Sequence, residues 1–171
     1  MNQSERNIKS YGFTLAEMLV TIVILGVAAM VVIPSIGNTT DMQATSAARQ
    51  LVSDLLFTQT YSISQKHPYQ VVFDAANDSY EVQDSNTSNV ITHPITKTPY
   101  RMSFPTDQHL KDVQITSANF DAGNLVKFNS LGMPYNSAGS QLAARGTVTL
   151  IAGTHNITVT VEPVSGRINT P

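Results

Sequence analysis

Glu17 is the only charged residue in the long apolar stretch from Phe13 to Ile33. A carboxylate is costly in such a stretch, because a charged group in apolar surroundings needs a partner. If the chain were cut after Gly12, the new α-amine of Phe13 would lie one helical turn from Glu17. That amine could pair with Glu17 of the same chain or of a neighbouring copy. A helix N-terminus also favours a nearby carboxylate, so the spacing gives Glu17 a charge-pairing role in a processed chain.

The stretch 13–33 is long enough to cross a membrane. Its 21 residues would form a helix of ~31 Å, about the thickness of the hydrocarbon core of a bilayer. Before it, Arg6 and Lys9 outnumber Glu5. This positive excess predicts that the N-terminus stays in the cytoplasm and that the rest of the chain lies on the other side.

Two simpler interpretations of this segment compete. A secretory signal peptide could be cut after the small residues Val27-Ala28-Ala29, which would make Met30 the first residue of the mature protein. A plain single-span membrane anchor would need no cut at all. Neither interpretation gives Glu17 a use, since a charge inside the apolar region only weakens insertion.

The run Lys9-Ser10-Tyr11-Gly12 followed by Phe13-Thr14-Leu15-Ala16-Glu17 resembles the class III signal of type IV prepilins and type II secretion pseudopilins. The resemblance implies that residues 1–12 are a leader, that a prepilin peptidase cuts after Gly12, and that the same enzyme N-methylates Phe13. It implies that Glu17 acts in assembly. The expected partners are the peptidase, the membrane, and other pilins or pseudopilins that contact the N-terminal helix.

The resemblance also implies where the protein resides and how its first helix behaves. We expect a single-pass protein of the bacterial inner membrane, with its head in the periplasm or otherwise outside the cytoplasmic membrane, which later joins a pseudopilus. Gly26 and Pro34 fall where the first helix of the family has helix-weakening residues. Pro34 lacks an N–H, so the helix should kink or loosen there.

The remainder, 34–171, is predicted to form one head. A helix is expected over about 40–64, because its apolar residues recur at helical spacing and form a stripe that should pack on a sheet. After Pro68 the period changes to two, which predicts strands and hairpins. The helical stripe and the strand candidates are Ala44, Ala47, Ala48, Leu51, Val52, Leu55 and Leu56, and segments 69–73, 80–82, 113–115, 125–128, 147–151 and 157–161.

Between these elements lie segments without a regular period. Residues 84–110 are rich in Asp, Asn, Ser, Thr and Pro, and predict a long loop with at most one short strand. Residues 131–136 form a turn cluster, and Asp74 and Asp78 flank a turn in which each should bond its own backbone. The predicted fold class is therefore α+β: a long N-terminal helix, half for the membrane and half packed on an antiparallel sheet, as in pilins.

The C-terminal part strengthens the family assignment. The stretch VKFNSLGMPYNSAG, then a hairpin, then VTVEPVSGRI, is similar to the head of the GspH/FimT group of minor pseudopilins and minor pilins. The implied function is that of a non-enzymatic minor pseudopilin in a type II secretion system. The alternative is a FimT-like minor type IV pilin that acts in pilus assembly or DNA uptake.

Nucleic-acid binding is weakly supported. Some FimT-like pilins bind DNA through Gly-Arg-x-Arg, but Asn169 stands where the second Arg would follow Gly166-Arg167. Arg145 is a further candidate contact, yet residues 41–171 carry 8 basic against 10 acidic side chains. Such a balance gives little general attraction to phosphates. The four histidines are scattered and there is no cysteine, so no catalytic residue, metal or cofactor is expected.

Overall fold

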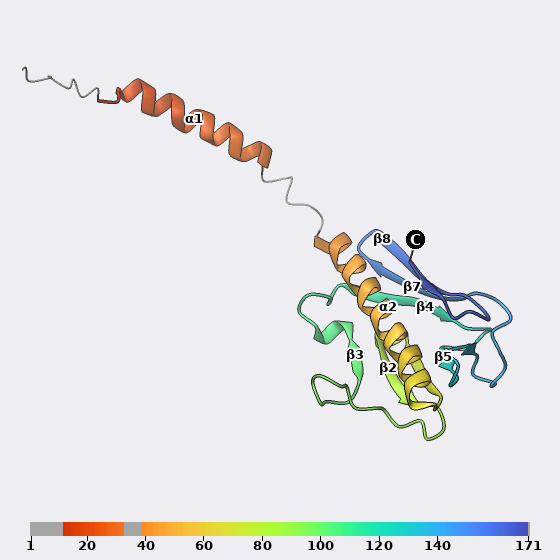
Figure 1. The fold of residues 1–171 in the computed structure, drawn as a ribbon. Coiled ribbons are helices and arrows are strands. Elements are labelled where there is room, and N and C mark those ends of the chain that lie inside the picture. Colours follow the sequence, from red (N-terminus) through yellow and green to blue (C-terminus); the bar gives the residue numbers. More distant parts are fainter. Residues whose placement is uncertain (1–11, 33–38, 171) are drawn as a thin grey trace, which may run out of the picture. The chain divides into compact units, whose positions relative to one another are not determined.

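The computed structural model describes residues 12–32 and 39–170. The chain divides into two compact units, Met1–Gly37 and Asn38–Pro171, and each is considered separately (Figure 1). The described part of the first unit is one helix and the three residues before it. The second unit is the head, whose described residues 39–170 form one α-helix, one short 3-10 helix and nine strands.

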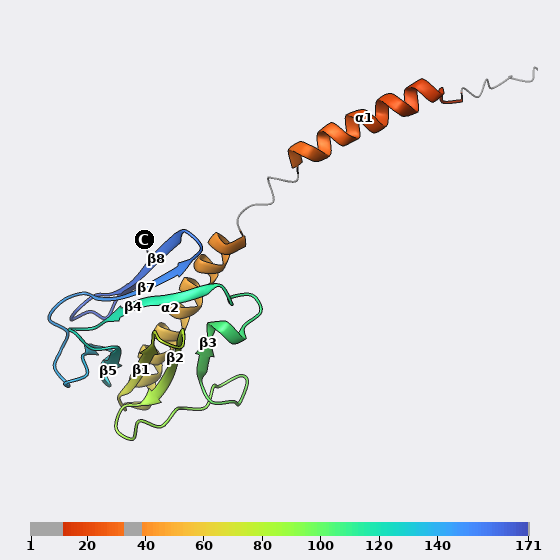
Figure 2. The same cartoon turned by 180° about the vertical axis from the view of Figure 1, so that it is seen from behind.

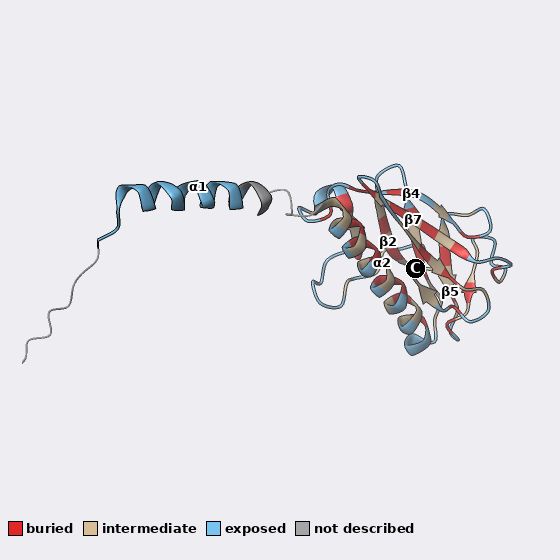
Figure 3. Cartoon of the chain, turned by 90° about the horizontal axis from the view of Figure 1, so that it is seen from above, coloured by how far each residue is buried: buried red, intermediate tan, exposed pale blue. Residues whose placement is uncertain are grey.

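Helix α1 spans Leu15–Val32. Thr14 caps its start, because the Thr14 Oγ1 accepts a hydrogen bond from the Glu17 N–H at 3.2 Å. The helix is continuous through Gly26, so Gly26 does not interrupt it, and any weakening there stays a prediction. The predicted break at Pro34 lies outside the described residues. All residues from 12 to 29 are exposed (Figure 3).

Across the described residues, no helix has both the length and the apolar character needed to span a bilayer.

Helix α2 spans Thr39–Gln65, and its inner face packs on the strands. That face is lined by small and aliphatic side chains as the stripe predicted, except that Leu56 is exposed. Leu56 was therefore wrongly placed in the core stripe. The buried face continues instead through Asp54, Thr58 and Ser62. The hydroxyls of Thr58 and Ser62 donate to helix carbonyls four residues earlier, at 2.7 and 2.8 Å, which satisfies them in the core.

The strands form two antiparallel sheets, and Figures 1 and 2 show α2 on one side of the strands of both. The five-stranded sheet has the order β3-β2-β1-β5-β6, and the four-stranded sheet has the order β4-β7-β8-β9. The strands are β1 Tyr69–Asp74, β2 Ser79–Asp84, β3 Arg101–Ser103, β4 Val113–Asn119, β5 Leu125–Phe128, β6 Pro134–Tyr135, β7 Gly146–Ala152, β8 His155–Val161 and β9 Ile168–Asn169.

Both predicted hairpins are present, as β1–β2 and β7–β8. Strand β4 runs four residues beyond the predicted 113–115, through a bulge between Ile115 and Ser117. Strand β6 lies inside the predicted turn cluster. The segment 84–110 contains the single short strand β3, and it also supplies Tyr100 and Phe104 to the core, which its composition did not predict.

The two aspartates of the β1–β2 turn behave differently. The Asp74 carboxylate accepts hydrogen bonds from the backbone N–H groups of Ala76 and Asn77, at 3.1 and 3.2 Å, as predicted for turn chemistry. The Asp78 carboxylate instead accepts from the Ile115 N–H at 2.8 Å. The prediction that Asp78 bonds its own turn is wrong, because its side chain ties the hairpin of one sheet to β4 of the other.

Candidate functional site

The predicted cleavage site lies in exposed chain just before α1. Gly12 and Phe13 have no regular secondary structure, and Phe13 is 72% exposed. A Cβ placed on Gly12 would meet no atom within 4 Å, so nothing in the described chain requires glycine there. Any requirement for a small residue at position 12 therefore comes from another molecule, one that acts on the bond between Gly12 and Phe13.

Glu17 sits in the first turn of α1, three residues after its cap. At this position a carboxylate interacts favourably with the helix dipole. The described residues contain three ion pairs, His67–Asp84, Arg101–Glu81 and Arg145–Glu162, and none of them involves Glu17. A cut after Gly12 would place the α-amine of Phe13 one residue before the cap, within one turn of Glu17.

In the head, two loops meet at Gln59 of α2. Each loop belongs to one of the two C-terminal stretches that carry the resemblance to the GspH/FimT group. The Gln59 Nε2 donates to the carbonyl oxygens of Gly132 at 2.8 Å and Gly166 at 3.1 Å. Both glycines have left-handed backbone, with φ of 80° and 64°. A Cβ on Gly166 would collide with Gln59 and lie 2.7 Å from the Gly132 oxygen. We call this arrangement the Gln59 clamp. Left-handed backbone and close neighbouring atoms together explain both glycines.

A second buried cluster centres on Asp54 of α2, which is 3% exposed. Its carboxylate accepts hydrogen bonds from the Tyr80 hydroxyl at 2.6 Å and the Tyr100 hydroxyl at 3.0 Å. Gln50 Nε2 donates to the same carboxylate at 3.0 and 3.2 Å. The ring of His93 packs on that of Tyr100, with centroids 4.4 Å apart. Asp54 therefore fastens the segment 84–110 to α2.

Burial determines the ionisation of this cluster. It raises the pKa of Asp54, against the opposing effects of the hydrogen bonds from Tyr80, Gln50 and Tyr100 and of the charge of His93. Burial, together with the nearby Asp54 carboxylate, also raises the pKa of both tyrosines, so they remain donors at neutral pH. The cluster has the properties of a structural tie, because the Asp54 carboxylate and the two tyrosine hydroxyls bond one another within the head.

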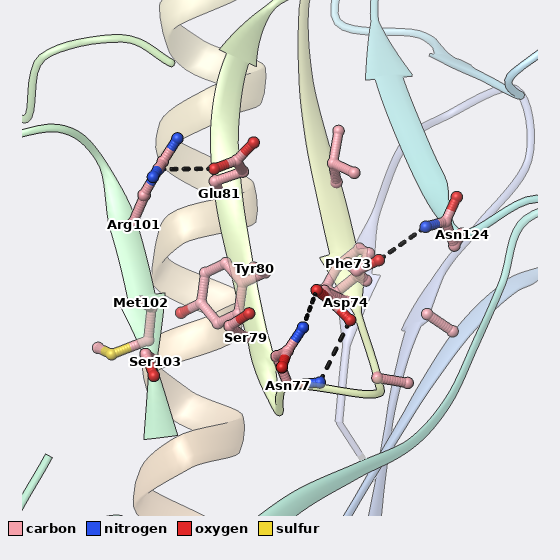
Figure 4. A pocket seen from close by; sticks show the side chains of 13 residues that line it. Phe73, Asp74, Asn77, Ser79, Tyr80, Glu81, Arg101, Met102, Ser103 and Asn124 are labelled. Carbon is pink, nitrogen blue, oxygen red and sulfur yellow. Dashed lines mark hydrogen bonds and ion pairs between the residues drawn. The ribbon is translucent and has the colours of Figure 1, made fainter. Parts of the chain in front are cut away.

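A hollow of about 670 Å³ lies over the β1–β2 turn and β3 (Figure 4). Two of its polar side chains are engaged within the chain: Arg101 Nε pairs with Glu81 Oε2 at 2.7 Å, and Asn124 Nδ2 donates to the Phe73 oxygen at 2.7 Å. Asp74 accepts from Asn77 on the same wall. The described side chains offer no nucleophile–base pair in this hollow. No group of three or more His, Asp or Glu side chains in the described ranges could hold a metal ion.

Comparison with known protein families gives one match. The model described as the prokaryotic N-terminal methylation motif covers residues 8–33. The N-terminal segment carries that motif. It spans the Gly12–Phe13 bond, Glu17 and Gly26, and agrees with the resemblance to prepilins in the sequence. A search of curated proteins by sequence gave no match.

Solved structures identify the fold of the head. The minor pseudopilin EpsH from the type 2 secretion system of *Vibrio cholerae* aligns with a TM-score of 0.54 and 12% identity, over 75% of this chain and 96% of that one. The type IV minor pilin FimU of *Pseudomonas aeruginosa* aligns with a TM-score of 0.51 and 12% identity, over 75% and 87%. The head therefore has a pilin-like fold, with an N-terminal helix packed against antiparallel sheets.

In this pilin-like head, both Arg145 and Arg167 interact with Glu162. Arg145 Nε pairs with Glu162 Oε1 at 2.9 Å, and the Glu162 N–H donates to the Arg167 oxygen at 2.9 Å. With its amide turned to satisfy both groups, Asn169 accepts from the Arg167 guanidinium at 3.1 and 3.3 Å. The Glu162 charge, paired with Arg145, reduces the local positive potential that DNA binding would need.

Three positioning residues were not predicted from the sequence. Thr14 had a readable signal, since Thr-x-x-Glu before an apolar run is a capping-box pattern. Asp54 interrupts an apolar stripe, which is a signal for a buried, partnered acid. Gln59 had no signal, because an amide on a helix is ordinary until the loops that it binds are placed.

Proposed function

We propose that this protein is a minor subunit of a pseudopilus or type IV pilus, without enzymatic activity of its own. The methylation motif at residues 8–33 carries the proposal, and the pilin-like head supports it. In this role the chain is cut between Gly12 and Phe13 and methylated on the new amine. Exposed, irregular backbone at that bond is what a peptidase needs, and the described chain packs nothing against it.

Assembly would then use the exposed apolar side chains of α1. In a membrane before assembly, these side chains contact lipid, and in the filament they contact neighbouring helices through van der Waals packing. Glu17 registers each subunit by pairing with the Phe13 amine of a neighbour or of its own chain. The pair is selective because an unpaired charge in apolar surroundings is costly.

We favour the type II secretion pseudopilus, on the similarity of the C-terminal stretches to the GspH group. A type IV pilus is the alternative, since EpsH and FimU resemble the head to nearly the same degree, with TM-scores of 0.54 and 0.51. Use in DNA uptake is less favoured, because Asn169 replaces the second arginine of the binding motif and Glu162 is paired with Arg145.

N-terminal sequencing of the protein purified from bacterial membranes tests the proposal. We expect the mature chain to begin at methylated Phe13. A start at Met30 would show a conventional signal peptide and reject the pilin role, and an intact Met1 would show an unprocessed anchor.

Deletion of the gene then identifies the machine. Loss of exoprotein secretion with intact surface pili is expected for the pseudopilus. Loss of pili or of DNA uptake, with normal secretion, would support the alternative instead.

A further inference from the structure

We propose that the uncovered edge of strand β8 receives an extended segment from a different subunit of the fibre. The segment would add a strand to the four-stranded sheet of the head. This inference rests on the proposed filament role and names one contact within it. Strand addition joins proteins through main-chain hydrogen bonds, and side-chain pockets beside the edge select the partner.

Strand β8 is covered along only part of its outer side. It pairs with β7 along its whole length, from His155 to Val161. On the other side, β9 pairs only with Thr160 and Val161. No other strand or bridge within 39–170 pairs with residues 155–159 on that side. We call residues 155–159 of β8 the open edge.

The open edge presents backbone donors and acceptors. Both backbone groups of Glu162, just beyond β8, point toward β9: its N–H donates to the Arg167 oxygen at 2.9 Å, and its oxygen accepts from the Gly166 N–H at 3.0 Å. Because this direction alternates along an antiparallel strand, the backbone groups of Asn156 and Thr158 point the same way. An added strand that continues the line of β9, antiparallel to β8, would bond all four groups.

The other described edges carry features that prevent such pairing, as edge strands usually do. Strand β4 has a bulge after Ile115, whose N–H is taken by the Asp78 carboxylate. Strands β6 and β9 have two residues each, and β3 has three, one of them Arg101. The open edge has neither proline, lysine nor bulge, and its Ile, Thr and Val favour strand structure. Among the described edges it is the one suited to accept a strand.

A hollow of about 340 Å³ lies along the open edge, between β8 and the first half of α2. Its lining is Thr45, Ala48, Arg49, His155, Asn156, Ile157 and Thr170. Ile157 is only partly buried, whereas Val159 and Val161, on the same face of β8, are fully buried. An aliphatic side chain of the added strand would cover Ile157 and so gain hydrophobic stabilisation.

Arg49 determines the charge that the segment meets. It is exposed, it is the one permanently charged residue among those that line this hollow, and it forms none of the ion pairs in the described part of the chain. Asp41 lies two turns earlier on α2, ~12 Å along its axis, and lines only the next hollow. Glu162 and Arg167 lie beyond the covered end of β8. The open edge therefore favours a segment with a carboxylate.

A second copy of this chain does not supply such a segment. Its other described edges are short or bulged, and its own open edge has no carboxylate to offer Arg49. A minor subunit also has subunits of other kinds as its usual neighbours in a fibre. The partner is thus an extended segment of a different subunit, with an aliphatic residue and an acid at alternate positions on one face.

Titration of the isolated head, followed by nuclear magnetic resonance, tests the strand addition. The head can be used alone, since its core is formed entirely by residues of the second unit. The probe is the peptide acetyl-Thr-Val-Thr-Glu-Thr-Val-Thr-amide, which places its valines and its glutamate on one face of a strand. We expect the largest chemical-shift changes at the amides of Asn156 and Thr158. The same peptide with lysine in place of glutamate should bind about threefold more weakly.

Thr158→Pro and Thr158→Val separate the backbone from the side chain. Both variants lose the Thr158 hydroxyl, but only proline also removes the N–H, which is tolerated because that N–H does not bond β7. Thr158→Val should bind the peptide like the parent, and Thr158→Pro about tenfold more weakly. Equal binding by the two folded variants would overturn the proposal.

A modified peptide gives the same test without any change to the head. N-methyl groups on every second residue remove the donors along one edge of the peptide. We expect binding to be lost when the methylated residues are those that face β8, and to be kept when they are the others. Equal binding of both methylated peptides would reject strand addition.

Photo-cross-linking in bacteria tests the choice of partner. A photoreactive residue is placed at Asn156 or, as a matched control, at Gln114, which is exposed on the β4 edge. We expect cross-links from Asn156, and not from Gln114, to a different protein that carries its own N-terminal methylation motif. Cross-links between two copies of this chain, or equal cross-linking from both positions, would overturn the assignment. Neither result affects the filament role, which N-terminal sequencing decides separately.

Discussion

Every residue from 12 to 29 is exposed, whereas the head buries a continuous core from α2 through β8. In the head, two unusual residues have a reason within the chain: Gly166 fits the Gln59 clamp, and Asp54 binds two tyrosines. In the described part of the N-terminal segment, no contact requires glycine at position 12, and Glu17 forms no ion pair. This difference agrees with the proposal that Gly12 and Glu17 serve partners outside the chain, whereas the unusual residues of the head stabilise its own fold.

The largest effect is expected at Gly12. Replacing Gly12 with Leu should abolish processing, so that the mature chain keeps residues 1–12, while the stability of the head is unchanged. Intact-mass measurement of the protein from membranes checks the first part, and thermal unfolding of the head checks the second. If the variant instead has the mass of a chain that begins at Phe13, Gly12 is not required for cleavage. The contrast between the N-terminal segment and the head would then be lost.

Glu17→Val should also spare the head and the insertion of the chain, but reduce incorporation into filaments more than roughly tenfold. The reason is that a partner amine left alone in apolar surroundings costs more than ~1.4 kcal/mol. Quantifying the subunit in sheared filaments measures this. Glu17→Asp, which keeps the charge, is the matched control and should retain most incorporation; equal incorporation of all three proteins would reject charge pairing.

Asp54→Ala should affect the head and leave the N-terminal segment unchanged. It should lower the free energy of unfolding of the head by about 2–4 kcal/mol without affecting cleavage. The variant leaves the hydroxyls of Tyr80 and Tyr100 without their acceptor in the core. Urea unfolding measures the loss. Asp54→Asn keeps an acceptor oxygen and should lose less. If Asp54→Ala unfolds like the parent, Asp54 does not fasten the segment 84–110.

The same division shows which features sequence alone could predict. Local patterns act over a few residues, so the helix over 40–64, both hairpins and the methylation motif were readable. Contacts between distant segments were not: Tyr100 and Phe104 join the core from a polar segment, and Asp78 reaches β4 across 37 positions. Leu56 was misassigned because the spacing of a helical stripe does not reveal how wide the buried face is. Thr58 and Ser62 lie on the buried face instead, since their hydroxyls bond carbonyls of their own helix.

The smallest effect concerns pH, and it distinguishes two carboxylates within the head. Burial raises the pKa of Asp54, so the folded head binds that proton more tightly than the unfolded chain does. Its contribution to stability therefore grows as the pH falls through the folded pKa toward 3.8, by at most about 1.4 kcal/mol per pH unit. For Asp84, burial is outweighed by hydrogen bonds from Asn86, Thr87 and His67, and its pKa is lowered. Its contribution is present above 3.8 and is lost as the pH falls below it.

Stability differences between parent and variant isolate each group. The advantage of the parent over Asp54→Asn should increase on acidification, and its advantage over Asp84→Asn should decrease. Urea unfolding of all three heads between neutral pH and about pH 3 measures both slopes. Slopes of the same sign would mean that Asp54 is not desolvated in the folded head, and that its hydrogen bonds from Tyr80 and Tyr100 determine its ionisation instead.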